Sequence, residues 1–136
     1  EGLTIQDNAD LESLGTALDD VESIGDGLTI EDNAVLETVD TLNVLESVGP
    51  TDISNNGDLV NITGFNGIES LDGGLTVNSN RSLRRFGGFS SLKSVNGTVN
   101  FNDNDALTRN NMHKRRGCLH RPRRQRKKTR ILHTAC

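Results

Sequence analysis

The side chains best suited to nucleophilic or metal chemistry gather at one end of this 136-residue chain. The chain has two cysteines, Cys118 and Cys136, and three histidines, His113, His120 and His133. Residues 1–107 therefore contain neither residue type. This excludes a Ser–His–Asp or Cys–His nucleophile and a Cys/His zinc site from residues 1–107. Cys118-x-His120 and His133-x-x-Cys136 could supply the four ligands of a zinc cluster, but their spacing is unusual and the segment between them is highly charged.

Carboxylates are therefore the main acid–base groups in residues 1–107. Paired acids can cleave glycosidic bonds, but these acids are spread through the segment. Asp7, Asp32, Asn55, Ser79 and Asp103 occupy one place in a repeat, and stacking would bring the first two within about 5 Å. Calcium would relieve that repulsion, although a solvated polar surface explains the same pattern and is preferred. We expect no catalytic residue, no cofactor and no metal site, and we expect that the chain is not an enzyme.

Charge divides the chain into two segments. Residues 1–107 hold all 19 acidic residues and four basic ones, a net −15, whereas residues 108–136 hold 11 basic residues and no acidic one, a net +11. Such an asymmetry indicates two segments with different roles. No apolar run approaches the roughly 18 residues needed to cross a bilayer, so no transmembrane segment is expected.

An internal repeat organises the acidic segment. Asparagine recurs every 23 to 25 residues, with an apolar residue three positions before it and leucine three positions after it. Two successive copies read GLTIQDNADLESLGTALDDVESIGD and GLTIEDNAVLETVDTLNVLESVGPT. The recurrent asparagines are Asn8, Asn33, Asn56, Asn80 and Asn104. This period is typical of a solenoid, in which each unit buries its apolar face against the next.

Each unit opens with a short alternating segment that predicts a strand with one buried face. Apolar residues then recur every third position, but Asn, Asp, Gly and Ser interrupt any helix, so short extended or 3₁₀ segments with tight corners are expected. Stacked units pair their strands at about 4.8 Å. The sequence thus predicts a mainly β solenoid of about four and a half coils over residues 1–107, with one parallel sheet. The asparagine amides should satisfy main-chain groups at a corner and pair from coil to coil as a structural ladder.

The repeat L-x-I-x-x-N-x-x-L-x-x-[LVIF]…[ILV]-x-G resembles the leucine-rich repeat of receptor L domains. It is similar to the ligand-binding L domains of insulin- and epidermal-growth-factor-type receptors, and closer to L-domain-like repeats of fungal and other microbial cell-surface proteins. Over residues 2–107 the resemblance implies a right-handed β-helix or solenoid with an extracellular, ligand-binding or wall-associated role. The segment lacks the cysteines of disulfide-bonded caps. Thr51 replaces an apolar residue, so the third coil is expected to be locally loose.

A repeated polar surface suits recognition more than chemistry. We expect a non-catalytic recognition or structural module, at the cell surface or outside the cell, with a protein or glycan ligand on the outward side of the strands. The positions of this ligand face are Thr4, Gln6, Thr29, Glu31, Asp52, Ser54, Thr76, Asn78, Asn100 and Asn102. Sequons make Asn61 and Asn96 candidate glycosylation sites in a secreted protein, whereas Asn80 belongs to the ladder and should be too buried.

Residues 108–136 form a basic low-complexity tail that is expected to be disordered unless it binds something. It is open to four interpretations: an arm for nucleic acid or an acidic surface, a convertase site at residues 121–124, the zinc cluster, or a gene-end artefact. A plain disordered tail or an artefact is favoured, and zinc is favoured least. The alternative function is an intracellular protein that associates with nucleic acid through this tail alone.

Overall fold

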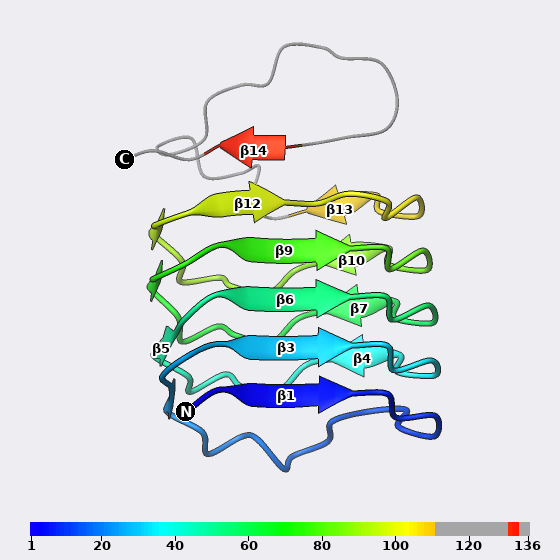
Figure 1. Cartoon of the computed structure of the whole chain (residues 1–136), viewed down its shortest axis with the longest axis horizontal. Coiled ribbons are helices and arrows are strands. Elements are labelled where there is room, and N and C mark those ends of the chain that lie inside the picture. The colour runs from blue at the N-terminus through cyan, green and yellow to red at the C-terminus, as the bar shows by residue number, and fades with distance from the viewer. Residues whose placement is uncertain (111–130, 134–136) are drawn as a thin grey trace.

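The computed structural model describes residues 1–110 and 131–133 and forms a stack of about four coils (Figure 1). One strand of each coil contributes to a main sheet, in the order β1-β3-β6-β9-β12-β14. These strands are β1 (Leu3–Gln6), β3 (Leu28–Glu31), β6 (Thr51–Ser54), β9 (Leu75–Asn78), β12 (Thr98–Asn100) and β14 (Ile131–His133). The described residues contain no helix, so the predicted mainly β solenoid is confirmed.

Three smaller sheets complete the coils, where the sequence predicted only one sheet. A four-stranded sheet has the order β13-β10-β7-β4, and two two-stranded sheets pair β2 with β5 and β8 with β11. Their strands are β2 (Ser23–Ile24), β4 (Thr38–Val39), β5 (Ser47–Val48), β7 (Asn61–Ile62), β8 (Ser70–Leu71), β10 (Arg85–Phe86), β11 (Ser94–Val95) and β13 (Arg109–Asn110). The segments expected to be extended or 3₁₀ are two-residue strands separated by hydrogen-bonded turns, such as Asn33–Leu36 and Leu42–Leu45. Stacking supplies the hydrogen-bond partners of the strands.

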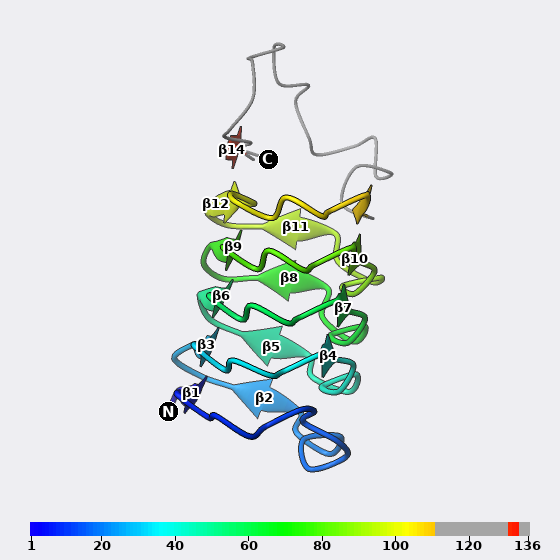
Figure 2. The same ribbon diagram turned by 90° about the vertical axis from the view of Figure 1, so that its right-hand side faces the viewer.

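The coil is right-handed. In Figure 1 the strands β1 to β12 of the main sheet run left to right in front, and β4, β7 and β10 return behind them while the chain climbs. Figure 2, turned by 90°, shows the main sheet and the β4–β7–β10 sheet on opposite sides, with β2, β5, β8 and β11 closing the far end of each coil. Right-handed crossovers between parallel strands are the rule, because strand twist favours them.

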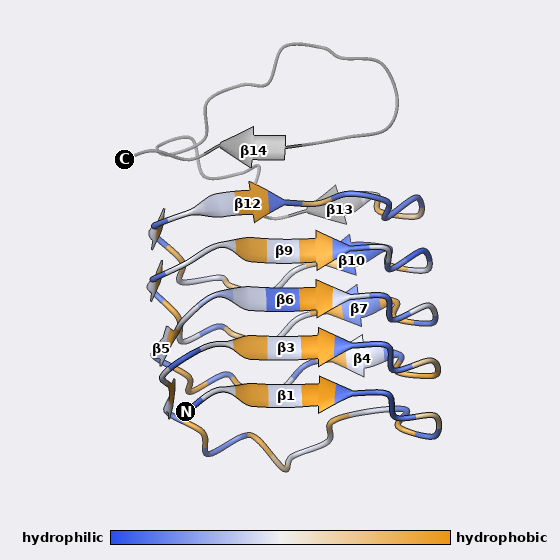
Figure 3. Cartoon of the chain, in the orientation of Figure 1, coloured by the Kyte–Doolittle hydropathy of each residue, from blue (hydrophilic) through white to orange (hydrophobic). Residues whose placement is uncertain are grey.

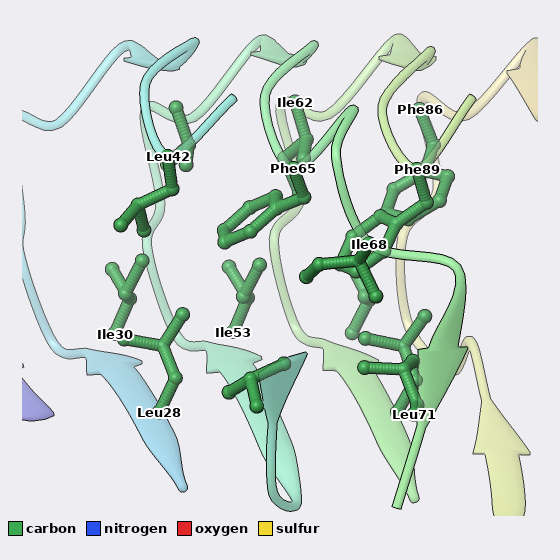
Figure 4. Packing of buried hydrophobic residues seen from close by; sticks show 14 of the residues in the cluster. Leu28, Ile30, Leu42, Ile53, Ile62, Phe65, Ile68, Leu71, Phe86 and Phe89 are labelled. Atoms are coloured by element: carbon green, nitrogen blue, oxygen red, sulfur yellow. The ribbon is translucent and has the colours of Figure 1, made fainter. Parts of the chain in front are cut away.

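The core fills the interior of the coils. Strands β3 and β9 alternate between buried and half-buried residues, and Figure 3 shows the apolar segments of the main sheet in register from coil to coil. Side chains from all faces meet inside (Figure 4), and those labelled there are Leu28, Ile30, Leu42, Ile53, Ile62, Phe65, Ile68, Leu71, Phe86 and Phe89. Phe65 stacks on Phe89 with 4.7 Å between ring centroids, and Phe86 meets Phe101 edge-on at 4.9 Å. Burying such a side chain stabilises the fold by about 1.5–3 kcal/mol.

Strand pairing is present on both sides of residue 107, the predicted end of the repeat. Arg109 and Asn110 pair with Arg85 and Phe86 as strand β13, because the main-chain ladder of β10 offers free groups whatever side chains follow. Residues 131–133, placed by the sequence in a disordered tail, form β14 and pair antiparallel with β12. Residues 111–130 and 134–136, with both cysteines, two of the histidines and the predicted convertase site, lie outside the described residues.

The third coil is not loose, contrary to the expectation for Thr51. Thr51 is 2% exposed, its hydroxyl donates to the carbonyl of Gly49 at 3.3 Å, and its N–H donates to the carbonyl of Gly74 at 3.0 Å. The hydroxyl finds a local acceptor, so a polar side chain is tolerated at a buried position. Among the described residues, none belongs to a helix long and apolar enough to cross a membrane.

Candidate functional site

The predicted ligand-face residues form two columns on the outward side of the main sheet. Parallel register places residues of equivalent position directly beside one another on neighbouring strands. The first column is Thr4, Thr29, Asp52, Thr76 and Asn100, and the second is Gln6, Glu31, Ser54 and Asn78, followed by Asn102. Because successive side chains of a strand point to opposite faces, both columns point away from the apolar core.

Accessibility differs along these columns. Thr4 and Gln6 are exposed, and most of the remaining positions are half-buried because side chains on strands about 4.8 Å apart shield one another. Ser54 is only 7% exposed and is the one buried position among those predicted for the ligand face. Its short side chain lies in register between Glu31 and Asn78, whose longer side chains leave it little access to solvent.

The recurrent asparagines form the expected ladder along one corner of the solenoid. The main-chain N–H and the Nδ2 of Asn33 both donate to Oδ1 of Asn56 at 3.1 Å. The Nδ2 of Asn56 donates to the carbonyls of Ile30 and Ser54 at 2.9 Å, and its main-chain N–H donates to Oδ1 of Asn80 at 3.0 Å. The three central ladder residues are fully buried. The side-chain amides of these three residues are hydrogen-bonded to main-chain groups and to one another, so they stabilise the corner and are not available to a ligand.

The residue before each ladder asparagine adopts a left-handed backbone conformation. Its φ lies between 51° and 57° in all five coils, at Asp7, Asp32, Asn55, Ser79 and Asp103. Asp and Asn tolerate this conformation better than most residues because their short polar side chains bond locally. The left-handed backbone conformation therefore explains why Asp and Asn recur in this column, which the sequence offered as a calcium site. No group of three or more His, Cys, Asp or Glu residues that could hold a metal occurs among residues 1–110 and 131–133.

Three buried side-chain oxygens on the outward face have no hydrogen-bond partner. They are Oδ1 of Asp52, Oδ1 of Asn100 and Oδ1 of Asn102. Within the part of the chain that the structure describes, these are the only buried side-chain polar atoms in this condition. An unpaired buried acceptor costs about 1–3 kcal/mol, and such groups are rare in folded proteins. All three belong to the predicted ligand face, over strands β6 and β12.

Comparison with known proteins gives no relative. No family model, no curated protein and no solved structure matches the chain. The interpretation of this surface therefore rests on its own geometry, and the likeness to receptor L-domain repeats stays a hypothesis.

The three sequons differ in accessibility. Asn96 is exposed at the corner between β11 and β12, where its Nδ2 donates to Oδ1 of Asp72 at 3.0 Å. Asn61 is half-buried within β7, between the neighbouring strands β4 and β10. Asn80 is fully buried, as predicted. Asn96 is therefore the most accessible of the three acceptors for a glycan.

A second, shorter asparagine pair was not recognised in the sequence. Nδ2 of Asn66 donates to Oδ1 of Asn43 at 2.8 Å and to the carbonyl of Thr63 at 2.9 Å, while the N–H of Ser90 donates to Oδ1 of Asn66. The 23-residue spacing of Asn43 and Asn66 was the available signal. Because Asn43 is exposed and Asn66 is only half-buried, their contribution to stability is smaller than that of the buried ladder.

Proposed function

We propose that this chain is a non-catalytic recognition module that binds a protein or glycan ligand through the outward face of its main sheet. The observation that supports it is the pair of outward columns, which run in register across five parallel strands. Parallel strands hold these side chains at a regular spacing on a rigid support, and rigid support lowers the entropy lost on binding. In this proposal the module is of the receptor L-domain type and works at the cell surface or outside the cell.

Chemistry is the weaker interpretation of the same surface. Residues 1–107 have no histidine or cysteine to act as a nucleophile or a general base. Catalytic sites bring different groups together at one point, whereas this face repeats similar side chains from coil to coil. A surface of this kind favours many weak, parallel contacts with an extended partner, as in other solenoid proteins.

Screening arrays of extracellular proteins and of glycans tests the proposal, with variants made on one sheet at a time. The face variant Thr29→Lys/Thr76→Lys places two bulky charges in the first column, which should abolish binding of any ligand seated there. The matched variant Ser47→Lys/Ser70→Lys places the same charges on β5 and β8, away from the main sheet. If no ligand on either array binds, or if the face variant binds its ligand as well as the wild type does, the proposal is wrong.

The alternative is association with nucleic acid through the basic tail. Arg84 and Arg85 are exposed on the fourth coil, and Arg85 is in register with Arg109 of strand β13, so basic residues also occur on the solenoid. Binding of this kind would fall steeply with salt, because it releases counterions from phosphate. It would also be unaffected by the variants of the outward face. A salt titration against one oligonucleotide, with the wild type and the face variant, therefore separates the two functions.

A further inference from the structure

The side of the solenoid opposite the main sheet changes the sign of its charge along the stack. This return face is formed by β4, β7, β10 and β13, and the first three of these strands lie behind the main sheet in Figure 1 and on the right in Figure 2. Main-chain hydrogen bonds from coil to coil place equivalent residues in register across it. In coil order, its first column is Glu12, Glu37, Val60, Arg84 and Thr108, and its second is Ser13, Thr38, Asn61, Arg85 and Arg109.

The charged positions of the return face lie symmetrically about its middle coil. Glu12 and Glu37 are on the first two coils, Arg84 and Arg85 are on the fourth, and all four side chains are exposed. The middle coil contributes the uncharged and half-buried Val60 to the first column. Glu37 and Arg84 are each one coil from Val60, on opposite sides of it. An acidic half and a basic half therefore have the same spacing from the centre.

These charges are not paired with one another inside the molecule. Among the described residues, ion pairs join the amino group of Glu1 to Asp26 and the side chain of Glu69 to Lys93, and neither pair includes a residue of the return face. Residues on the second and fourth coils are two strand spacings apart, or about 10 Å, which is too far for a direct contact. The opposite charges of the face can therefore be paired by a second molecule.

The charge order of the return face is complementary to itself under a two-fold rotation. An axis parallel to the strands over β7 brings the return faces of two copies together and reverses the direction of one stack. Glu37 of each copy then lies opposite Arg84 of the other, and Val60 lies opposite its own equivalent. Two stacks in the same direction would instead oppose like charges, so the charge order selects the antiparallel arrangement. Because a two-fold contact is closed, association stops at the dimer.

The other surfaces of the solenoid suit a second copy less well. Strand β14 covers the edge of β12 at one end of the stack. At the other end, residues 1–27 contain eight acidic residues and no basic one, so two such ends repel each other. The ten predicted positions of the outward face include no basic residue, and on the third side of the coils Lys93 is already paired with Glu69. Opposite charges in register are thus a property of the return face.

We propose that the return face is an interface between two antiparallel copies of this chain, with Glu37 of each copy paired to Arg84 of the other. This inference goes beyond the proposed recognition function, because it uses the side of the solenoid opposite the outward face (Figure 2). The outward faces of the dimer point away from each other, so one dimer can cross-link two ligands. A contact built from exposed charges is weak and sensitive to salt.

Sedimentation velocity of the full chain tests the interface by charge reversal. The wild type should dimerise as its concentration is raised at low salt, and the dimer should weaken at physiological ionic strength. Glu37→Arg and Arg84→Glu should each raise the dissociation constant by about 10-fold or more, because each makes both charge contacts of the dimer repulsive. An equimolar mixture of the two variants should dimerise as well as the wild type, since both contacts between the unlike copies are again between opposite charges.

Two matched controls make the same charge changes on the third side of the coils. Glu46→Arg lies beside β5 and Lys93→Glu lies beside β11, away from the return face. Both should associate as the wild type does. Because the two face variants are each expected to recover association when they are mixed, that recovery also shows that both are folded.

The mixture separates this interface from other sources of association. If the basic tail of one copy bound the acidic coils of another, Glu37→Arg would weaken association, Arg84→Glu would not, and mixing would restore nothing; the proposed interface would then be wrong. It is also wrong if the controls weaken association as much as the face variants do. If the wild type stays monomeric at low salt and Arg84→Glu instead weakens binding of an oligonucleotide, the return face takes a phosphate polymer and not a second copy.

Discussion

Replacing Asn56 by alanine is the most direct test of the ladder. The side chain is fully buried at the centre of the stack, so no solvent can replace its hydrogen bonds. Without it the main-chain N–H of Asn33 loses its bond to Oδ1 of Asn56, which costs about 1–3 kcal/mol. The two bonds donated to the carbonyls of Ile30 and Ser54 add about 0.5–1.5 kcal/mol each. We therefore expect the free energy of unfolding to fall by about 2–6 kcal/mol.

The assay is chemical denaturation of the full chain followed by circular dichroism, with Asn8→Ala as the control. Asn8 belongs to the same ladder but is exposed, so water can replace its bonds to the carbonyl of Gln6 and to Oδ1 of Asn33. Its loss should cost no more than about 1 kcal/mol. Equal destabilisation by the two variants would refute the argument that burial sets how much each ladder residue contributes to the free energy of unfolding.

A third variant isolates the donors of the ladder. Asn56→Asp keeps the shape and the acceptor for Asn33, but an ionised carboxylate would face two carbonyl oxygens. Burial beside these acceptors should raise the pKa of the introduced carboxyl, since only the protonated form can donate. The folded state would then bind a proton that the unfolded state releases above about pH 4, so the variant should lose stability as pH rises.

Three further substitutions test packing and edges. Gly64→Ala should destabilise strongly because a Cβ there collides with the carbonyl of the preceding coil, whereas Gly57→Ala meets nothing and should be nearly neutral; similar melting temperatures for the two would contradict the coil spacing. Phe86→Ala should lower the free energy of unfolding by about 3–5 kcal/mol, because Phe86 is fully buried and stacks on Phe89. Val44→Ala, at an exposed position, should lower it by less than about 0.5 kcal/mol. Equal values from calorimetry would argue against the aromatic core. Leu132→Pro should break β14 and increase association in sedimentation velocity by exposing the edge of β12; unchanged association would mean that β14 does not protect that edge.

The sequence predicts the main sheet well because each of its strands carries a strong local signal. The segment Leu28-Thr29-Ile30 alternates, and the next asparagine fixes its register, so the outward columns follow directly. The strands of the smaller sheets have two residues each, too few for alternation to appear. Their pairing is decided by the stacking of whole coils and not by local pattern.

One feature of the core and one of the outward face depend on tertiary context and could not be predicted. Leu42, Phe65 and Phe89 have φ between 57° and 63°, which their bulky side chains disfavour in isolation. Burial in the core, at exposures of 0 to 2%, outweighs that strain. The loss of access at Ser54 likewise depends on the length of neighbouring side chains, which its own strand does not reveal.

The two-way bonding of the asparagine ladder makes the coil a unit of exchange. From Asn8 to Asn80 the main-chain N–H of each ladder residue donates to the asparagine of the next coil, over separations of 23 to 25 residues. From Asn33 to Asn104 the side-chain amide donates to a carbonyl of the preceding coil. Removing one whole coil would bring the main-chain N–H of Asn33 to Oδ1 of Asn80 in place of Oδ1 of Asn56, so the donor would still meet an equivalent acceptor. A deletion of any other length would leave the N–H donor and the Oδ1 acceptor without each other. The protein can therefore lengthen or shorten in evolution only in steps of one coil, and each step changes the extent of its outward face by about 4.8 Å.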